Sequence, residues 1–251
     1  MAMEPPVIRL EGVSKTFTTQ NSGVVKAIDD ISFDVRQRDF ISIIGPSGCG
    51  KSTILRLISG LEQASSGSIA LSDAVDKDGF GYVFQDSVLL PWKTVRENVA
   101  FPLEIKGDKD GKGMERVDRL LETVELESFA DSYPKELSGG MRQRTSIARS
   151  LSYDPDVLLM DEPFGALDAL TRDSLNVELR KIWKATDKTI IFVTHDIDEA
   201  VFLSTKVVVL SGRPSTVREV VPIELADDRD LSIRSDQKFR AYADKLRGML
   251  E

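Results

Sequence analysis

A glycine-rich stretch that directly follows a short apolar run constrains this chain more than any other feature. Residues 40–44 read FISII, and residues 45–53 read GPSGCGKST. The second stretch fits the pattern G-x-x-x-x-G-K-[ST] in full, and its flanks predict a strand before it and a helix after it. A glycine turn between a strand and a helix directs successive backbone N–H groups toward phosphate oxygens. The sequence therefore predicts a parallel α/β unit that opens with a nucleotide-binding loop.

The residues of this loop have separate expected roles. Lys51 is expected to reach the β- and γ-phosphates of a nucleotide, and Ser52 to ligate Mg²⁺. Cys49, the only cysteine of the chain, fills a free position of the pattern, so its backbone amide is expected to matter more than its thiol. The residues predicted to bind the phosphates are Gly45, Pro46, Ser47, Gly48, Cys49, Gly50, Lys51, Ser52 and Thr53.

Apolar strand patterns occur on both sides of this loop in the sequence. They read VIRLEGVSKTF, VVKAIDDISFDV and GFGYVFQ in the first part, and DVLLMDEP and TIIFVTHD farther on, separated by the helical pattern ALTRDSLNVELRKIW. Near-continuous apolar strands that alternate with helices indicate a parallel sheet. Gly60 and Gly67 predict a helix end and the turn that follows it. The last part of the chain predicts a hairpin turning at residues 212–214 and then an amphipathic helix.

Residues 86–154 lack the pattern of a buried strand. The segment ERVDRLLETVEL within them repeats apolar residues at helical spacing. We therefore expect one domain over residues 1–251, in which residues 1–85 and 155–251 form the nucleotide-binding α/β core with a β subdomain. Residues 86–154 are expected to form an inserted helical subdomain.

Three polar side chains follow predicted strands of the core. Asp161 ends the run VLLMD, where a carboxylate can hold Mg²⁺, and Glu162 follows, where a carboxylate can orient or deprotonate an attacking water. His195, the only histidine, follows the strand pattern IIFVT. Ligands gather at the carboxyl ends of strands in open α/β sheets. The position of His195 therefore predicts a contact with the γ-phosphate.

A second glycine-containing turn occurs in the segment KELSGGMRQRTSIARSL, residues 135–151. Ser138 can cap a helix beginning near Met141, and Gly139 and Gly140 leave backbone N–H groups at the positive end of that helix. This anion site falls in the helical region and is not expected to fold back onto the first loop. Two copies of the chain, arranged head to tail about a two-fold axis, would place each Ser138 over the other's nucleotide. The sequence thus predicts ATP shared between subunits.

Six motifs together resemble the ATPase subunit of an ABC transporter: GPSGCGKST, VFQ, LSGGMRQR, LLMDEP, ALD and VTH. The resemblance extends from Val7 to about Leu225. It implies a RecA-like P-loop NTPase core with an antiparallel β subdomain and an inserted α-helical subdomain, in a closed dimer around two ATP molecules. It further implies that Phe17 stacks on adenine, that Gln85 senses Mg²⁺ and the attacking water, and that Asp168 crosses the dimer interface.

Further sequence features indicate which subgroup of ABC transporter ATPases the chain resembles. Met141 departs from the family pattern, since many relatives have glutamine there, whereas Glu162 and His195 are retained. The segment LLPWKTVRENVAFPLE and the hairpin GRPSTV resemble the nitrate, sulfonate and taurine importers. This resemblance implies uptake of a small solute through integral membrane permease subunits, with a second ATPase subunit, identical or paralogous, and indirectly a solute-binding protein.

The apolar residues after Gln85 are suited to receive a short helix from such a permease. They are Val88, Leu89, Leu90, Pro91 and Trp92. Packing of these side chains in the core is the alternative.

Charge and composition narrow the choice of partners. Thirty-three basic and 41 acidic residues give a net charge of -8, which disfavours a broad nucleic-acid surface. The apolar runs are far shorter than the ~20 residues that span a bilayer, and the N-terminus lacks a signal-peptide pattern. We therefore expect a peripheral protein at the cytoplasmic face of the inner membrane, attached through its partner. The alternatives are a soluble ABC-type ATPase acting on nucleic acid or ribosomes, an exporter ATPase and a non-hydrolysing nucleotide-binding scaffold.

Overall fold

The computed structural model describes residues 5–19, 23–76, 79–107, 112–186 and 188–251. The strands are β1 (Ile8–Thr19), β2 (Gly23–Val35), β3 (Phe40–Ile44), β4 (Ser66–Leu71), β5 (Phe80–Val83), β6 (Val157–Asp161), β7 (Thr189–Val193), β8 (Lys206–Leu210) and β9 (Val217–Pro222). The α-helices are α1 (Lys51–Ile58), α2 (Val95–Lys106), α3 (Lys112–Thr123), α4 (Gly139–Leu151), α5 (Ala169–Thr186), α6 (Ile197–Leu203) and α7 (Gln237–Leu250). The 3₁₀ helices are η1 (Glu127–Phe129), η2 (Pro134–Glu136) and η3 (Leu231–Ser235).

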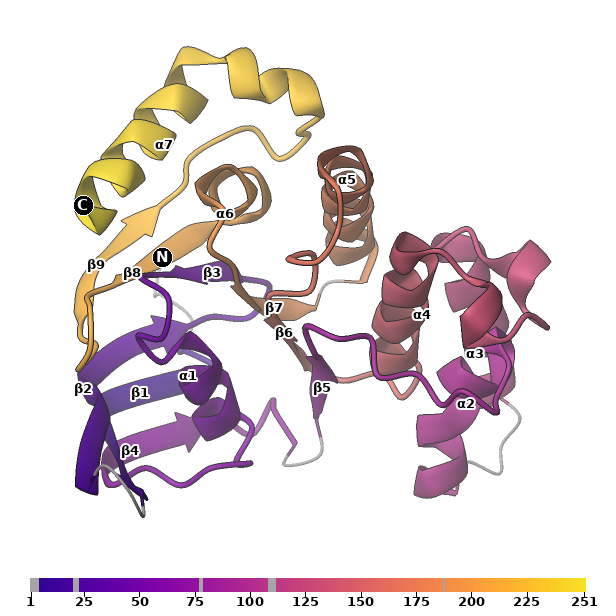
Figure 1. The fold of residues 1–251 in the computed structure, drawn as a ribbon, viewed down its shortest axis with the longest axis horizontal. Helices are drawn as coiled ribbons and strands as arrows, with labels where there is room; N and C mark the ends of the chain where they lie inside the picture. Colours follow the sequence, from indigo (N-terminus) through magenta and orange to yellow (C-terminus); the bar gives the residue numbers. More distant parts are fainter. Residues whose placement is uncertain (1–4, 20–22, 77–78, 108–111, 187) are drawn as a thin grey trace.

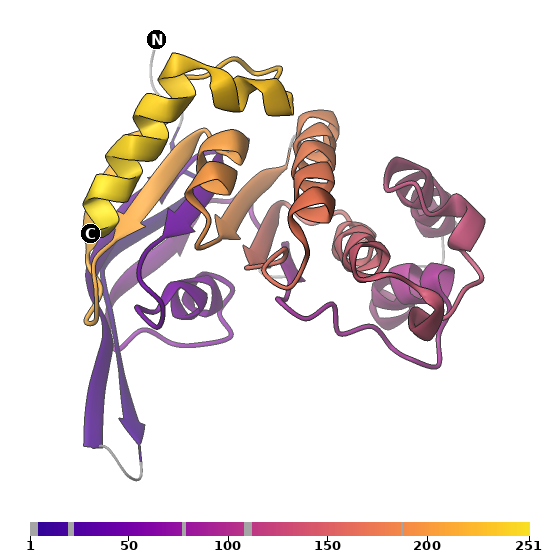
Figure 2. The same ribbon diagram turned by 45° about the horizontal axis from the view of Figure 1, so that its top comes forward.

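Two sheets and a group of helices make up the molecule (Figure 1). The larger sheet has the strand order β5-β6-β7-β3-β8-β9, and its neighbouring pairs are parallel except for β8 and β9. The smaller, antiparallel sheet has the order β2-β1-β4. Helices α2, α3 and α4 lie between β5 and β6 in the chain and stand at the far end of the molecule from the smaller sheet (Figures 1 and 2). This arrangement confirms the predicted α/β fold class, with its antiparallel sheet and helical insertion.

The core lies on both faces of the larger sheet, because successive strand residues point to opposite faces. Ile41 and Ile43 of β3 pack on one face with Ile54 of α1 and with the smaller sheet. Phe40 and Ile44 of the same strand pack on the other face with α5, α6, α7 and the helical insertion. Both faces of the larger sheet are therefore covered.

Strand β4 and helices α2 and α6 go beyond the elements predicted from the sequence. β4 is an edge strand with most of its side chains exposed or half-buried, so it lacks the apolar alternation of a strand with one buried face. Helix α2 contains Pro102, which is unusual in a helix interior. Helix α6 has only 7 residues, of which Glu199 to Leu203 are buried. An apolar run of this length reads equally as a strand.

Gly67 lies within β4 rather than in a turn, so the expectation for this residue is wrong. Its φ is +80°, and a Cβ atom at this position would lie 2.3 Å from the carbonyl oxygen of Gly12 in β1. Only glycine permits this close approach of two backbones. The β1–β4 register shifts between Glu11 and Ser14, beside the same contact. Gly67 therefore serves strand pairing.

Asn98 of α2 is fully buried and holds the loop that precedes the helix. Its Oδ1 accepts a hydrogen bond from the backbone N–H of Leu90 at 2.8 Å. Its Nδ2 donates to the carbonyl oxygens of Leu90, Lys93 and Thr94, at 3.1, 3.0 and 2.9 Å. One side chain thus fixes the course of the backbone between Leu90 and Thr94.

Asn98→Ala should lower the free energy of unfolding by about 2–4 kcal/mol, because the change takes the hydrogen-bond partner from the Leu90 N–H and the Lys93 carbonyl and leaves a gap where the buried amide was. Urea unfolding followed by circular dichroism measures this loss. Glu104→Ala is the control, since it breaks only the exposed ion pair with Lys93 on the same helix and should cost less than about 1 kcal/mol. Equal losses in the two variants would contradict the role given to Asn98.

Candidate functional site

The predicted phosphate loop joins β3 to the first turn of α1. Gly50 is the N-cap of α1 with a φ of +112°, a conformation that favours glycine, and no side chain caps the helix. The backbone N–H groups of the first turn therefore lack intrahelical acceptors and can bind an anion. Cys49 is buried, and burial raises the pKa of its thiol. The loop thus offers backbone amides rather than a reactive thiol.

The ammonium group of Lys51 lies inside this loop. Its Nζ donates hydrogen bonds to the carbonyl oxygens of Gly45 and Pro46, at 3.1 and 3.3 Å, and lies 3.8 Å from Oε1 of Glu162. The residue is only 5% exposed. A buried charge needs close partners, and one carboxylate at this distance is a weak one. The loop therefore fits the phosphates of a nucleotide, which would complete the pairing of this lysine.

Ser52 and Asp161 meet beside the loop. The Ser52 hydroxyl, in the first turn of α1, donates a hydrogen bond of 2.8 Å to Oδ1 of Asp161 at the end of β6. Burial raises the pKa of Asp161; the Ser52 hydrogen bond opposes this shift, and the nearby Glu162 carboxylate adds to it. In nucleotide sites Mg²⁺ is held by a few protein oxygens together with phosphates and water. Ser52 and Asp161 fit this donor set, and a bound cation would favour the ionised carboxylate.

Glu162 lies between two side chains that can carry positive charge, Lys51 and His195. It follows β6 with a φ of +45°, an uncommon conformation for a residue other than glycine. Its backbone N–H donates to the carbonyl oxygen of Val193 at 3.0 Å, and its carbonyl oxygen accepts from the N–H of Gly165 at 3.1 Å. Its Oε2 lies 3.2 Å from Nδ1 of His195. Backbone held in a sparsely populated conformation by surrounding bonds is typical of functional sites.

Gln85 follows β5 and lies beside the turn that carries Glu162. Its Nε2 is 3.7 Å from the position that a Cβ on Gly165 would take, and Cβ of Glu162 is 3.9 Å from the same position. Gln85 is exposed, so its amide is accessible at this turn. The structure thus places the Gln85 side chain beside the turn that carries Glu162.

Arg149, near the end of α4, is a residue of this region that the sequence does not reveal. Its guanidinium donates to the carbonyl oxygens of Ser87 and Val88, at 3.2 and 2.8 Å, just after Gln85. Burial lowers the pKa of this guanidinium. The contact joins segments about 60 residues apart in the chain, so no local pattern could predict it.

Ser138 is the N-cap of α4, as the sequence predicts, and its Oγ accepts a hydrogen bond of 3.3 Å from the backbone N–H of Met141. The helix begins at Gly139, two residues before the expected start. Ser138 is exposed, whereas Gly140 is buried. Helices α4 and α1 are well separated in both views of the fold (Figures 1 and 2). A single chain therefore does not bring the Ser138 turn to its own phosphate loop.

Asp168 and Phe17 lie on further elements. Asp168 precedes α5 and accepts hydrogen bonds from the backbone N–H and the hydroxyl of Thr171, at 3.0 and 2.7 Å, which hold the pKa of Asp168 below its usual value. Phe17 lies in β1, half-buried, with Nζ of Lys15 4.9 Å from its ring centroid. The ring also packs against the core on the α1 side of the larger sheet, so Phe17 is in part a core residue.

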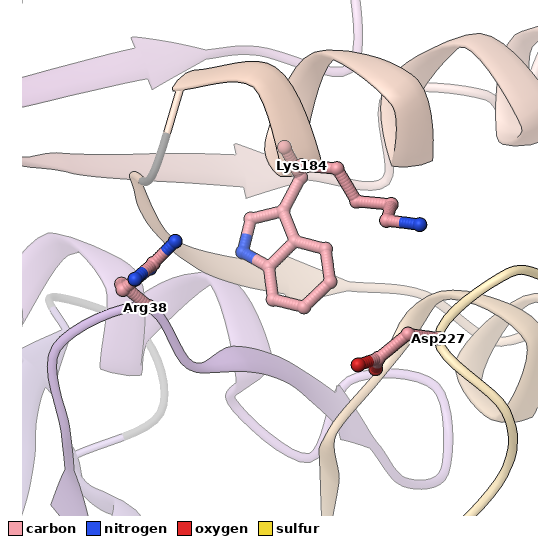
Figure 3. A pocket seen from close by; sticks show the side chains of 4 residues that line it. Arg38, Lys184 and Asp227 are labelled. Carbon is pink, nitrogen blue, oxygen red and sulfur yellow. The ribbon is translucent and has the colours of Figure 1, made fainter.

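A separate cavity of about 250 Å³ is lined by Arg38, Trp183, Lys184 and Asp227 (Figure 3). Arg38 precedes β3, whereas the phosphate loop follows β3, so the cavity lies at the opposite edge of the larger sheet. Lys184 is paired with Asp228 at 2.8 Å. This cavity is therefore distinct from the nucleotide site and contributes no residue to it.

The chain matches the family described as ABC transporter over residues 28–165, more than half of its length. The chain belongs to this family. An uncharacterized ABC transporter ATP-binding protein of Methanocaldococcus jannaschii is 45% identical, over 97% of this chain and 91% of its own. The aliphatic sulfonates import ATP-binding protein SsuB of Bacillus thuringiensis is 44% identical over 93% and 92%, and the taurine import ATP-binding protein TauB of Jannaschia is 39% identical over 97% and 93%.

Solved structures of ABC cassettes share the fold. The dimeric structure of the bacterial ABC transporter cassette MJ0796 has a TM-score of 0.74 and 33% identity, over 87% of this chain and the whole of that chain. The post-hydrolysis state of the same cassette, bound to ADP and phosphate, has a TM-score of 0.73 and 32% identity. These matches confirm the P-loop NTPase fold and identify this ABC protein as a nucleotide-binding ATPase coupled to transport.

Lys51→Ala should weaken ATP binding by about 10- to 100-fold, because it removes charge-assisted hydrogen bonds to phosphate. Cys49→Ala is the matched control in the same loop, and it should change the affinity less than about twofold because the thiol is buried and only the amide faces the ligand. Isothermal titration with ATP and Mg²⁺ measures both. A Cys49→Ala loss as large as that of Lys51→Ala would contradict the assignment.

Proposed function

We propose that this ABC ATPase is the ATP-hydrolysing subunit of an importer. Two copies, or this chain and a paralogue, would enclose two ATP molecules and drive an integral membrane permease. The cluster of Lys51, Glu162 and His195 at the phosphate loop supports the catalytic part of the proposal. The sulfonate and taurine import relatives support the uptake of a small oxyanion, such as a sulfonate, taurine or nitrate, delivered by a solute-binding protein.

Hydrolysis of the γ-phosphate needs a group that activates water and charges that offset those developing during transfer. Glu162 is the proposed base, because its carboxylate lies next to the loop and between Lys51 and His195. His195 would hold this carboxylate in place and contact the γ-phosphate. Lys51 would bind the β- and γ-phosphates from inside the loop.

Mg²⁺, when bound, would neutralise part of the phosphate charge. Ser52 and Asp161 would hold it, since their oxygens already meet beside the loop. Gln85 would contact the ion and the attacking water from the other side, because it lies at the Glu162 turn. These residues come from α1 and from the ends of β6 and β5, so the metal would join three separate segments.

The second subunit would supply the turn of Ser138, Gly139 and Gly140. Ser138 is exposed and caps α4 through one backbone N–H, which leaves the other N–H groups of the first turn for an anion. The dimeric structure of cassette MJ0796 supports a shared site of this kind. Phe17 would stack on the adenine of its own subunit, and Asp168 would cross to the partner.

A groove of about 630 Å³ between the larger sheet and the helical insertion is the proposed permease site. Most of its apolar lining comes from residues on or next to β5, α2 and α4: Phe80, Tyr82, Phe84, Phe101, Ile105 and Tyr153. Contiguous exposed apolar surface marks interaction sites, and within this groove Ile105 is 71% exposed. A short amphipathic helix of the permease fits such a groove.

The docking residues predicted from the sequence fall into two groups. Val88, Pro91 and Trp92 are exposed and can contact a permease. Leu90 is half-buried, and Leu89 is half-buried and packs against the core, so core packing applies to part of this cluster. The proposed surface therefore combines the three exposed residues with the groove.

Among the described residues, none of the helices has the length and apolar character needed to cross a membrane. The import relatives support attachment at the cytoplasmic face of the inner membrane through the permease.

Glu162→Gln should retain ATP binding, lose at least about 100-fold in turnover and accumulate as a dimer with ATP and Mg²⁺, because the amide cannot accept the proton from water. Light scattering after gel filtration measures the dimer, and phosphate release measures turnover. Glu219→Gln is the control, since it makes the same change in an exposed ion pair on β9. A monomeric Glu162→Gln protein at saturating ATP would contradict the shared site.

Ile105→Asp combined with Trp92→Ala should reduce recovery of the permease in co-purification by about 10-fold or more, since a charge in the groove opposes burial of an apolar helix. The control is Val24→Asp, which places the same charge on an exposed apolar residue of β2, outside the groove. Thermal melts of both proteins show whether each is folded. Unchanged recovery of the permease would remove the docking proposal.

A further inference from the structure

An arginine that the proposed chemistry does not use joins two of the functional loops. Arg172, in the first turn of α5, donates through Nη2 to the carbonyl oxygen of Leu167 at 3.0 Å. Its Nη1 donates to Oδ2 of Asp196 at 3.3 Å, and its Nε lies 3.8 Å from Oε1 of Glu199. Leu167 directly precedes Asp168, and Asp196 directly follows His195. One guanidinium therefore contacts both the loop of Asp168 and the turn of His195.

The acceptor beside His195 is itself rigidly held. Oδ1 of Asp196 accepts from the backbone N–H groups of Asp198 and Glu199, at 2.9 and 3.1 Å, as the N-cap of α6. The backbone N–H of Asp196 donates to the hydroxyl of Thr194 at 3.0 Å. His195 lies between these two residues in the chain. Where Arg172 holds Asp196, it therefore also sets the backbone that carries His195.

The other end of the connection is equally direct. The backbone N–H of Arg172 donates to the carbonyl oxygen of Asp168 at 2.9 Å, while its side chain holds the carbonyl oxygen of Leu167. Two consecutive carbonyl groups of this loop are thus bonded to one residue. A shift of the Asp168 loop must displace Arg172 or break these bonds.

Glu199 is a buried carboxylate next to the Arg172 guanidinium. Glu199 is 5% exposed, and burial raises the pKa of its carboxyl group. Its Oε2 accepts from the Thr194 hydroxyl at 2.5 Å, while Oε1 and Nε of Arg172 are buried without hydrogen bonds of their own. Without Arg172, the buried Glu199 would lose its ion-pair partner, which is costly in a buried place, and the half-buried Asp196 would lose its hydrogen bond from the guanidinium.

We propose that Arg172 is a positioning residue that fixes the Asp168 loop and the His195 turn relative to each other. The inference rests on the proposed function, which gives Asp168 its contact across the dimer and His195 its contact with the γ-phosphate. The forked guanidinium serves both loops because it can donate in two directions at once, which a lysine ammonium does less well. Contact with the partner subunit and orientation of the γ-phosphate contact are therefore set together.

The neighbouring residue supplies a matched control. Asp173 accepts two hydrogen bonds from Arg234 of η3, at 2.9 and 2.6 Å, and the two side chains are about as exposed as that of Arg172. This ion pair joins α5 to the C-terminal segment rather than to either loop. Asp173→Asn therefore removes a comparable interaction from the same helix turn and leaves every hydrogen bond of Arg172 in place.

The test compares ATP turnover of the full chain carrying Arg172→Ala, Arg172→Lys or Asp173→Asn with the unaltered chain. Arg172→Ala should lower kcat by about 10- to 100-fold with a change in KM for ATP of less than about twofold, because misplaced groups slow the chemical step more than binding. Arg172→Lys should recover only part of the loss, and Asp173→Asn should stay within about twofold. Added guanidinium at millimolar concentration should raise the turnover of Arg172→Ala but not that of Asp173→Asn.

Asp196→Asn keeps an amide oxygen for the cap of α6 and removes the charge that Arg172 meets. The Arg172→Ala, Asp196→Asn double variant should be no slower than Arg172→Ala alone, because both changes break the same contact. Additive losses, or a kcat for Arg172→Ala equal to that of Asp173→Asn, would overturn the positioning role. These outcomes bear on Arg172 when the unaltered chain hydrolyses ATP and the Glu162→Gln variant dimerises. If the unaltered chain is inactive or Glu162→Gln stays monomeric, the proposed function itself is contradicted.

Discussion

The buried ammonium of Lys51 is the interaction on which the rest of the site depends. It draws together the carbonyl groups of the loop after β3 and the carboxylate of Glu162 after β6. Glu162 in turn meets His195, which follows β7. A single cation with little access to water thus organises groups from three neighbouring strands. The protein groups around Lys51 pair its charge only in part. A phosphate bound in the loop would complete that pairing, so the same cation favours phosphate binding.

The parallel sheet explains why these groups meet at all. Asp161 of β6 lies opposite Val193 of β7, and Val193 lies opposite Ile43 of β3. These three residues form one row across the sheet, and each strand ends within a residue of that row. The residues that follow, among them Glu162 and His195, must then emerge side by side. Register alone therefore accounts for a large part of the site geometry.

The sequence predicts the parts of the molecule that follow from local pattern and from this topology. The phosphate loop has a specific spacing, and Asp161, Glu162 and His195 directly follow apolar runs, so strand ends could be located. Strand β4 could not be predicted, because the side chains of an exposed edge strand do not alternate between apolar and polar. Gly67 within it also resembles a turn residue. Helix α6 is too short for a helical period to appear.

Side-chain contacts between distant segments form a second class that sequence reasoning missed. Arg149 meets Ser87 and Val88, and Arg172 meets Asp196, only after the chain has folded. In the sequence each of these arginines is one basic residue among many on an amphipathic helix. Leu89 is the opposite case: the sequence predicts a docking residue, but in the folded chain its side chain packs against the core.

The grip of Arg149 on the backbone after Gln85 has a mechanical consequence. Helix α4 carries Ser138 at one end and Arg149 near the other, so the two are rigidly connected through the hydrogen-bonded helix. If α4 rotates relative to the larger sheet, either the Ser87–Val88 backbone moves with it or both hydrogen bonds from the Arg149 guanidinium break. A movement of the Ser138 turn is thereby coupled to a movement of the backbone that follows Gln85.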